Sequence, residues 1–396
     1  MSITNYRMLT PGPTPVPEAA LSRLSRQVRH HRTPDFTAIL QRVLANLQAV
    51  FKTTHPIASL QGSGTAAMEA CVANIIQPGD KALVLYSGKF AQRWAELVER
   101  FGGTAIRYTV PWGELFDPSE VAHYLAENPE IKAVYGTLVE TSTGVEHNIE
   151  GIGAIVRNTP ALFVVDGISG AGAVPCKVDE WGIDLLAVGS QKALMTPPGL
   201  AFVAVSPKAI GVMEHTEHRK TFYLDLLPYL NWNKTQGAPF TPARSLVEAL
   251  DASLQIILEE GIENVWESNF RKAEMVRAAV QAWGQAIPGF HIVAKRSADA
   301  LTVIHVPDTI EVKPLLAQLE SEFGIKLAAA QGDWKGKAFR ISNMGMVDTT
   351  DILAVVSALD YFLSRQTSQD LYGIGSAAAQ KRLGATIYRS QENDNR

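Results

Sequence analysis

The chain has 396 residues, of which 46% are hydrophobic and 19% are charged, with a net charge of −4 at pH 7 and a mean hydropathy of +0.01. This is the composition of a globular protein with a large core, and its charge gives no reason to expect a nucleic acid or an anionic membrane as partner. The two cysteines, Cys71 and Cys176, cannot form a disulfide framework or a zinc site, so we expect a reducing compartment, and we assign no metal site. Because no signal-peptide pattern and no apolar run of about 18 residues is present, we expect a cytoplasmic protein that does not cross a membrane.

The first predicted feature is an N-terminal arm. The segment TPGPTPVP at residues 10–17 is rich in proline, which fixes the backbone and lacks an amide hydrogen, so it cannot form a helix or a central strand. We therefore expect this segment to be extended and to lie on another part of the molecule, within an N-terminal arm at residues 1–20. Apolar residues at helical spacing then predict a helix from Asp35 to Phe51.

Short apolar runs alternate with helical segments in the next part of the chain. Seven of these runs predict strands at residues 55–60, 81–87, 104–110, 131–140, 161–166, 184–190 and 200–206. The alternation predicts an α/β fold with a mostly parallel sheet that helices cover on both faces. The last two runs are too close together for a helical crossover, so we expect one of them to be antiparallel.

The last part of the chain predicts a smaller α+β domain. A helical pattern runs from Pro242 to about Gly284, with a break expected at EEGIEN. Strands are then expected at 290–295, 301–306, 325–330 and 337–343, and helices at 312–324 and 349–365. We expect the chain to divide into an arm (1–20), a large domain (21–262), a small domain (263–366) and a polar tail (367–396). Within the tail we expect a helix at 376–385 and disorder at 389–396.

Small residues follow the first predicted strand, at the sheet edge where open α/β folds bind ligands. In GSGT at residues 62–65, backbone amides at a helix N-terminus can approach an anion, which the helix dipole also favours. The same residues also fit an ordinary tight turn with a threonine cap. The pattern is not a P-loop, because no Gly-Lys-Ser/Thr sequence follows.

Three further strand ends carry hydroxyl, carboxyl and amino groups. The hydroxyl residues of ETSTG at 140–144 either donate to a ring substituent or cap a loop. Asp166 ends an apolar run, and a buried carboxylate there needs a partner such as a cationic ring nitrogen, a helix N-terminus or an arginine. Lys192 lies in a short polar gap between two apolar runs, where it is either an ordinary surface lysine or a buried, nucleophilic amine with a lowered pKa.

These groups together are what a phosphorylated pyridine aldehyde needs: an anion cup, hydroxyl donors, a buried acid and a lysine. Over residues 8–365 the sequence resembles the class V, fold-type I pyridoxal-phosphate aminotransferases, in particular the alanine/serine–glyoxylate (serine–pyruvate) group. The motifs that carry the resemblance, in the order expected of that group, are TPGPTPVP, GSGTAAMEA, ETSTGV, VVDGISGAG and GSQKALMTPPG. The resemblance implies a seven-stranded sheet, pyridoxal 5′-phosphate as cofactor, small amino acids and 2-oxo acids as substrates, and a homodimer with shared active sites.

The resemblance also implies a role for individual residues. Lys192 would bind the cofactor as an imine and move the proton during transamination, and Asp166 would pair with the pyridine nitrogen. The residues implied in cofactor binding, besides these two, are Ser63, Gly64, Thr65, Phe90, Thr141, Ile168, Gln191 and Thr241. Gly12 and Arg340 would bind the substrate carboxylate, although Arg340 could instead form a structural salt bridge and Phe90 could pack in the core.

Three positions depart from the family pattern or add to it. Ala238 stands where the family often has a tyrosine, so one phosphate contact is missing or supplied elsewhere. Arg244 stands where the family usually has an apolar residue, and it either faces the site and favours acidic substrates or lies on the exposed side of a helix. His31 is expected to pack or form hydrogen bonds near the cofactor entrance, because Lys192 already moves the protons.

Several other activities compete with this reading. An aminotransferase for 2-aminoethylphosphonate would need a phosphonate clamp, for which Arg244 is the unexplained cation. A desulfurase or other lyase would need a cysteine on a mobile loop, whereas Cys71 is expected in a helix and Cys176 between two strands. A non-catalytic protein would not need both Lys192 and Asp166, and a nucleotide-binding protein would take up no coloured cofactor. The amino donor is not determined by the sequence, because side chains that differ by a methyl or hydroxyl group differ little in binding energy.

Overall fold

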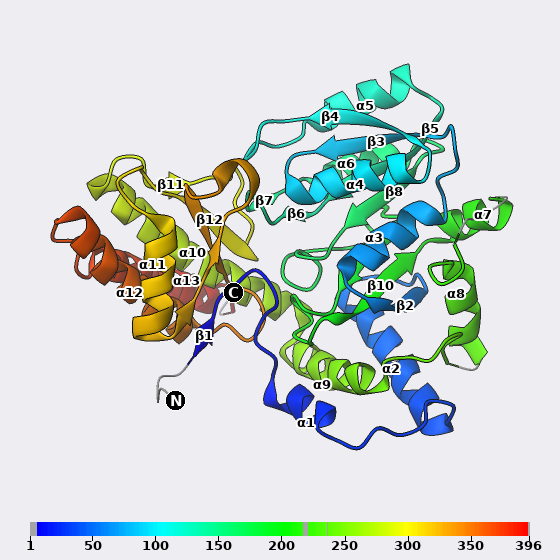
Figure 1. Cartoon of the computed structure of the whole chain (residues 1–396), viewed down its shortest axis with the longest axis horizontal. Coiled ribbons are helices and arrows are strands. Elements are labelled where there is room, and N and C mark those ends of the chain that lie inside the picture. Colours follow the sequence, from blue (N-terminus) through cyan, green and yellow to red (C-terminus); the bar gives the residue numbers. More distant parts are fainter. Residues whose placement is uncertain (1–5, 217–220, 236, 395–396) are drawn as a thin grey trace.

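A seven-stranded sheet forms the centre of the larger part of the molecule (Figure 1). The computed structural model describes residues 6–216, 221–235 and 237–394. The strands lie in the order β2-β10-β9-β8-β5-β3-β4. Their bounds are β2 Ile57–Gly62, β3 Lys81–Tyr86, β4 Thr104–Thr109, β5 Ile131–Thr137, β8 Leu162–Asp166, β9 Leu185–Gly189 and β10 Gly199–Val205. Strand β10 is antiparallel to both of its neighbours and the other pairs are parallel, which confirms the predicted sheet.

Helices cover both faces of this sheet because its strands are apolar on both sides. Consecutive residues of β8 alternate between two separate cores: Phe163 and Val165 pack in one, and Leu162 and Val164 in the other. The first core includes residues of α2, α5, α6 and α9, and the second includes residues of α3, α4, α7 and α8. The bounds are α2 Pro34–Val50, α3 Gly64–Ala73, α4 Lys89–Arg100, α5 Pro118–Glu127, α6 Ile149–Val156, α7 Pro207–His215, α8 Leu226–Thr235 and α9 Arg244–Glu260.

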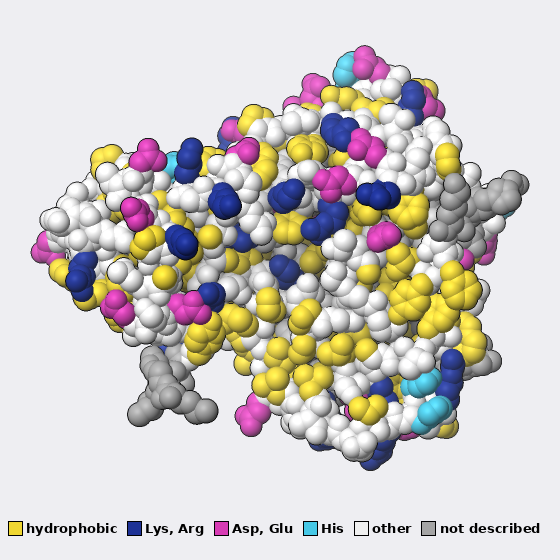
Figure 2. All heavy atoms as spheres, in the orientation of Figure 1, with side chains coloured by type: hydrophobic (Ala, Val, Ile, Leu, Met, Phe, Trp, Pro, Cys, Tyr) yellow, Lys and Arg dark blue, Asp and Glu magenta, His cyan; other side chains and the backbone are white. Residues whose placement is uncertain are grey.

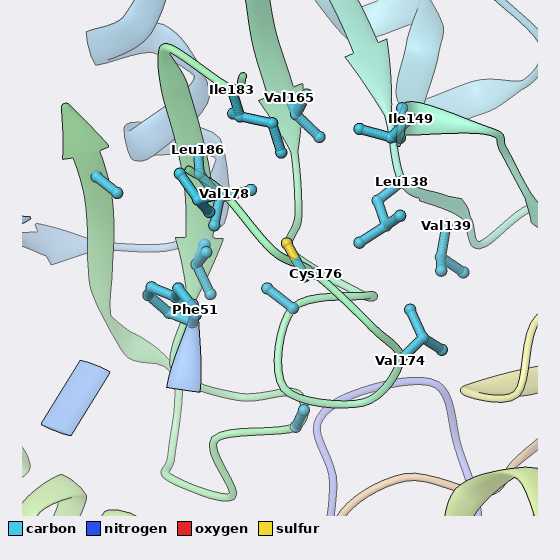
Figure 3. Packing of buried hydrophobic residues seen from close by; sticks show 14 of the residues in the cluster. Phe51, Leu138, Val139, Ile149, Val165, Val174, Cys176, Val178, Ile183 and Leu186 are labelled. Carbon is cyan, nitrogen blue, oxygen red and sulfur yellow. The ribbon is translucent and has the colours of Figure 1, made fainter. Parts of the chain in front are cut away.

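Both cysteines lie inside these cores as free thiols. Figure 3 shows part of the first core, in which Val165, Leu186 and Ile149 lie around the segment that carries Cys176. Cys71 belongs to α3 and packs in the second core. Burial raises the pKa of the Cys176 thiol to about 12 and also raises the pKa of Cys71, so neither is the reactive thiolate that a desulfurase requires.

The smaller C-terminal α+β domain contains an antiparallel sheet in the order β11-β12-β15-β14. Its strands are β11 His291–Ile292, β12 Leu301–His305, β14 Ala328–Ala329 and β15 Ala338–Ser342, with a short 3₁₀ helix at Gly332–Trp334. Its helices are α10 Ile262–Ala286, α11 Val312–Phe323, α12 Thr349–Thr367 and α13 Ile374–Asp394. The predicted break between α9 and α10 falls at Gly261, whose φ is 84°.

The N-terminal arm links the two parts of the molecule. Strand β1 (Arg7–Met8) pairs in parallel with β13 (Ile325–Lys326), the first two residues of the segment 325–330, which the sequence predicts as one strand and which is divided between β13 and β14. The arm then reaches the turn after β9, where Thr14 N donates to Gln191 O at 3.1 Å, and helix α1 (Glu18–Leu24) follows. A short hairpin of β6 (Val139–Glu140) and β7 (Val145–Glu146) lies between the two sheets (Figure 1).

The C-terminal tail is helical over a longer stretch than the sequence predicts. Helix α13 continues to Asp394 and includes most of the segment predicted to be disordered, and residues 395–396 lie outside the described residues. The first turn of α13 is fixed by the buried Asp360, whose carboxylate accepts from Gly375 N at 2.8 Å and from Ser376 N at 2.9 Å. Asp360 also accepts from Trp283 Nε1 at 2.7 Å. Because this cap comes from α12, the sequence of the tail alone does not reveal it.

Candidate active site

Lys192 lies in the turn between β9 and β10, directly under the N-terminal arm. Its Nζ donates to the carbonyl of Pro11, and Thr14 Oγ1 donates to its main-chain carbonyl at 2.8 Å. Burial lowers the pKa of the Lys192 ammonium to about 8, and Arg340 lowers it too, while Asp166 acts in the opposite direction. A substantial fraction of this amine is therefore neutral, and so nucleophilic, at mildly alkaline pH.

Asp166 ends β8 and is 3% exposed. The pKa of its carboxyl is raised to about 7, chiefly by burial and also by Glu140, against the lowering effect of a hydrogen bond from Ile168 N at 2.8 Å and of the charges of Arg93 and Lys192. Asp166 and Lys192 thus affect each other's pKa, yet no ion pair joins them in the described structure. A buried acid without a counter-ion fits a cationic ring nitrogen as its missing partner.

The residues predicted to form an anion cup lie at the N-terminus of α3. Ser63 is the N-cap residue, but its hydroxyl does not cap the helix and so is free to bind a ligand. Gly64 has no room for a side chain, because a Cβ there would lie 2.5 Å from Cδ1 of Ile168. Gln191 lies beside Gly64, because both residues are close to Gly189. A Cβ added to Gly189 would lie 2.9 Å from Gln191 Oε1 and 3.2 Å from Gly64 N. Gln191 Oε1 is buried without a hydrogen-bond partner, as expected for a group that binds a ligand.

Arg93 is a cation at this cup that the sequence reasoning missed. Its Nη1 donates to Thr65 Oγ1 at 3.1 Å, and its guanidinium lies 5.3 Å from the centre of the Phe90 ring. Among the described residues it forms no ion pair. The available signal was the spacing in FAQR, because residues three apart lie on the same side of a helix. A polar residue of an amphipathic helix is ordinarily solvated, so the pattern alone did not identify it.

The residues of ETSTG hold the start of α4 against the sheet. Glu140 is fully buried, and its carboxylate accepts from Phe90 N at 3.1 Å and from Ala91 N at 2.9 Å. Glu140 therefore anchors the backbone that carries Phe90, a role that the sequence alone did not reveal. Thr141 Oγ1 donates to Ser169 Oγ at 2.6 Å, so Thr141 lies beside the segment that follows Asp166.

Arg340 reaches the site from β15 of the C-terminal domain and is 7% exposed. Its Nη2 donates to Ala329 O at 2.8 Å and its Nη1 to Thr141 O at 3.4 Å. Burial lowers the pKa of Arg340 to about 10, so the guanidinium remains charged at neutral pH. The salt bridge considered as an alternative is not observed among the described residues, which leaves this cation available for a carboxylate.

Residues 237–243 lie between α8 and α9. Thr241 is exposed, and Ala238 is buried, with its carbonyl accepting from Arg32. Arg244 is 5% exposed, so the expectation that it lies on the exposed side of a helix is wrong. It pairs with Asp35 and with Glu248, each at 2.7 Å, and therefore has no free charge to offer a substrate.

His31 lies outside this group of contacts. It is partly exposed and stacks on His30, with ring centres 4.8 Å apart. The stacking agrees with a packing role, and the structure gives His31 no contact with Lys192 or Asp166.

The model of the aminotransferase class V family matches residues 11–336, which contain every residue of this site except Arg340. The chain belongs to the class V aminotransferase family. The L-aspartate–glyoxylate aminotransferase of Paracoccus denitrificans is 32% identical to it over 96% of this chain and 97% of the relative. The serine–glyoxylate aminotransferase of Methylorubrum extorquens is 31% identical over 95% of each chain.

A solved structure agrees with this membership. The ureidoglycine–glyoxylate aminotransferase of Bacillus subtilis superposes with a TM-score of 0.90 and 27% identity, covering 96% of this chain and 99% of that one. As a class V aminotransferase the chain has the fold-type I architecture, so the motifs predicted both family and fold correctly. No helix in the described part of this aminotransferase is long and apolar enough to cross a membrane. The described residues also contain no cluster of three or more His, Cys, Asp or Glu side chains that could hold a metal ion.

Proposed function

We propose that this aminotransferase uses pyridoxal 5′-phosphate to move the amino group of a small amino acid, alanine or serine, to a 2-oxo acid such as glyoxylate or pyruvate. The observation that carries the proposal is the pair of Lys192, with its pKa lowered to about 8, and Asp166, with its pKa raised to about 7, beside an anion cup. The relatives support glyoxylate as acceptor, because the names of all three proteins compared above include it.

The residues at the site fit the cofactor in charge and in shape. Ser63, Gly64, Thr65 and Gln191 would hold its phosphate, with Gln191 donating through its side-chain amide nitrogen. Arg93, within hydrogen-bond distance of Thr65, would supply the contact that is missing at Ala238. When bound, the cofactor supplies an aldehyde that condenses with amines and a ring that draws electrons from the substrate.

Four further residues would position and activate the ring. Asp166 would keep the ring nitrogen protonated, because a carboxylate in a buried site stabilises a neighbouring cation strongly. Phe90, whose backbone Glu140 anchors, would cover one face of the ring, and Ile168 would pack beside the phosphate cup. Thr141 would donate a hydrogen bond to the ring oxygen, exchanging its present partner Ser169.

Lys192 and Arg340 would act on the substrate itself. The neutral Lys192 amine would accept the proton of the substrate Cα and would later give a proton to the aldehyde carbon of the cofactor, C4′. A general base with a pKa near the working pH is suited to both transfers. Arg340 would bind the substrate carboxylate through two parallel hydrogen bonds, with the backbone of Gly12 close by.

The state of Arg244 bears on the choice of donor. Because Asp35 and Glu248 neutralise it, the structure offers no second clamp there for a phosphonate or a side-chain carboxylate. This favours small donors over 2-aminoethylphosphonate. Arg244 gives no support for aspartate either, and aspartate is the second candidate donor only because the aspartate–glyoxylate relative is as similar as the serine–glyoxylate one.

We also propose that the enzyme is a homodimer with shared active sites. Thr241, implied in phosphate binding, is exposed, and near it Phe222 is 81% exposed while Tyr223 stacks on Phe240 at 5.1 Å. An exposed aromatic cluster of this kind is typical of a subunit interface. Sedimentation of the holoenzyme at the mass of one chain would contradict the dimer. The cytoplasmic location and the domain boundaries at residues 20, 262 and 366 likewise remain proposals.

Single-turnover spectra test the proposed reaction. The holoenzyme is mixed separately with alanine, serine, aspartate and 2-aminoethylphosphonate, and the loss of the cofactor's imine absorbance is followed in time. We expect fast conversion with alanine or serine and recovery on addition of glyoxylate. Conversion by 2-aminoethylphosphonate alone would reject the proposed donor class, and no conversion by any amine would reject transamination.

A further inference from the structure

A second cavity lies behind the turn that carries Lys192. It has a volume of about 300 Å³ and is lined by residues of α9, α10, the segment 193–195 and the segment 345–349. Lys192, Asp166 and Arg340 do not line it, so it is separate from the site described above. Its volume is at the lower end of the range for small-molecule sites.

A buried lysine lies at one side of this cavity. Lys272, on α10, is 5% exposed and donates one hydrogen bond, to Val347 O at 2.8 Å. It forms no ion pair with any residue that the structure describes. An ammonium group has three donors, and burying it without an anionic partner is costly. Two donors of Lys272 are thus left for a ligand.

The rest of the cavity combines apolar walls with two carboxylates. Met195, Ile257 and Val265 supply apolar surface. Glu260 and Asp348 also line the cavity, and both are exposed. Asp348 caps α12 through Oδ1, which accepts from Asp351 N at 2.8 Å and from Thr350 Oγ1 at 2.7 Å, so its Oδ2 is the oxygen left to face a ligand. Both attract the Lys272 ammonium without reaching ion-pair distance. The cavity therefore offers a buried cation, an apolar wall and outer anions.

This arrangement matches the charge pattern of a free amino acid. A carboxylate would accept from Lys272, the neighbouring ammonium would lie toward Glu260 and Asp348, and an apolar side chain would cover Met195 and Ile257. A simple anion would leave the two carboxylates opposing it, and a simple amine would leave Lys272 unpaired. We propose that the cavity at Lys272 is a second amino-acid site, which binds a zwitterionic amino acid with an apolar side chain.

Calorimetric titration with L-leucine tests the proposal. The holoenzyme is used with its cofactor in the pyridoxamine form, which cannot condense with an amino group, so that binding and catalysis are read separately. We expect L-leucine to bind the wild type, and isocaproate and isoamylamine, which lack the amino or the carboxyl group, to bind about tenfold more weakly or worse. Equal binding of isocaproate and L-leucine would overturn the proposal.

Three variants locate the binding. Lys272→Met should weaken L-leucine binding about tenfold or more, while Lys337→Met, at an exposed lysine, should leave it unchanged. Arg340→Ala should also leave it unchanged, and loss of binding in that variant but not in Lys272→Met would assign the site to the active centre and overturn the proposal. If Lys272→Met does not fold, Glu260→Gln, at an exposed residue of the cavity, replaces it in the test. We expect this variant to bind L-leucine more weakly, and an affinity equal to that of the wild type would overturn the proposal.

Discussion

Gly12 packs directly against the side chain of Lys192: a Cβ on residue 12 would lie 2.5 Å from Lys192 Nζ. The φ of Gly12 is 132°, in the region that residues with side chains avoid. Lys192 Nζ also donates to the carbonyl of Pro11. The backbone of the arm thus forms one wall beside the Lys192 amine, so we expect the first residues of the chain to affect a site that a distant sheet assembles.

Replacing Gly12 with alanine should impair catalysis more than folding. The substitution places a methyl group at the position of the Lys192 side chain and strains the backbone by about 1–2 kcal/mol. We expect kcat/KM to fall about a hundredfold, since a displacement of about 1 Å in a catalytic group has effects of this size. The matched control is Gly211→Ala in α7, where a Cβ would meet nothing within 4 Å. Wild-type turnover in Gly12→Ala would show that the arm does not restrain Lys192.

The sheet and its ligand-binding edge could be predicted because each depends on local pattern. The apolar run before Asp166 predicts a strand that is buried on both faces. A lysine in a short turn between two such strands is therefore expected at the edge of the sheet. Arg93, Glu140 and the cap at Asp360 could not be predicted, because each acts on a partner far along the chain. The burial of Arg244 was missed for the same reason, since its partner Asp35 belongs to α2.

The rate at which protein freed of cofactor takes up pyridoxal phosphate should depend on pH through Lys192. Only the neutral amine attacks an aldehyde, and its fraction rises as the pH rises through the pKa. Because burial lowers the pKa of Lys192 to about 8, uptake should accelerate from pH 6 to pH 9 and then level off. Stopped-flow absorbance measures this profile. A rate still rising through the ordinary lysine value of about 10.4 would show that Lys192 is not perturbed.

Arg340→Ala should raise the KM for amino acids and leave reactions of simple amines unaffected. A hydrogen-bonded charge pair with the substrate carboxylate contributes about 1.5–3 kcal/mol, which corresponds to a 10- to 100-fold increase in KM. Steady-state kinetics with serine, compared with a half-reaction of ethanolamine, separates the carboxylate effect from a general defect. An unchanged KM for serine would assign the carboxylate clamp to another residue.

Arg93→Met should weaken the binding of pyridoxal phosphate about tenfold, because it removes a cation that lies within hydrogen-bond distance of Thr65. The dissociation constant is obtained by absorbance titration of protein freed of cofactor. Pyridoxal without its phosphate is the control ligand, and its affinity should be the same in both proteins. Arg107→Met, at an exposed arginine that pairs with Glu99, is the matched control variant. An equal loss of affinity for both ligands would indicate general damage to the site.

Mapping the lysine that carries the cofactor tests the account most directly. The holoenzyme is reduced with borohydride, digested and analysed by mass spectrometry. We predict that the cofactor mass appears on the peptide containing Lys192, and that Lys192→Ala is folded, inactive and unlabelled. The comparison is informative because burial also lowers the pKa of Lys272 to about 8. Label on Lys272 instead, or protein that takes up no cofactor, would contradict the account.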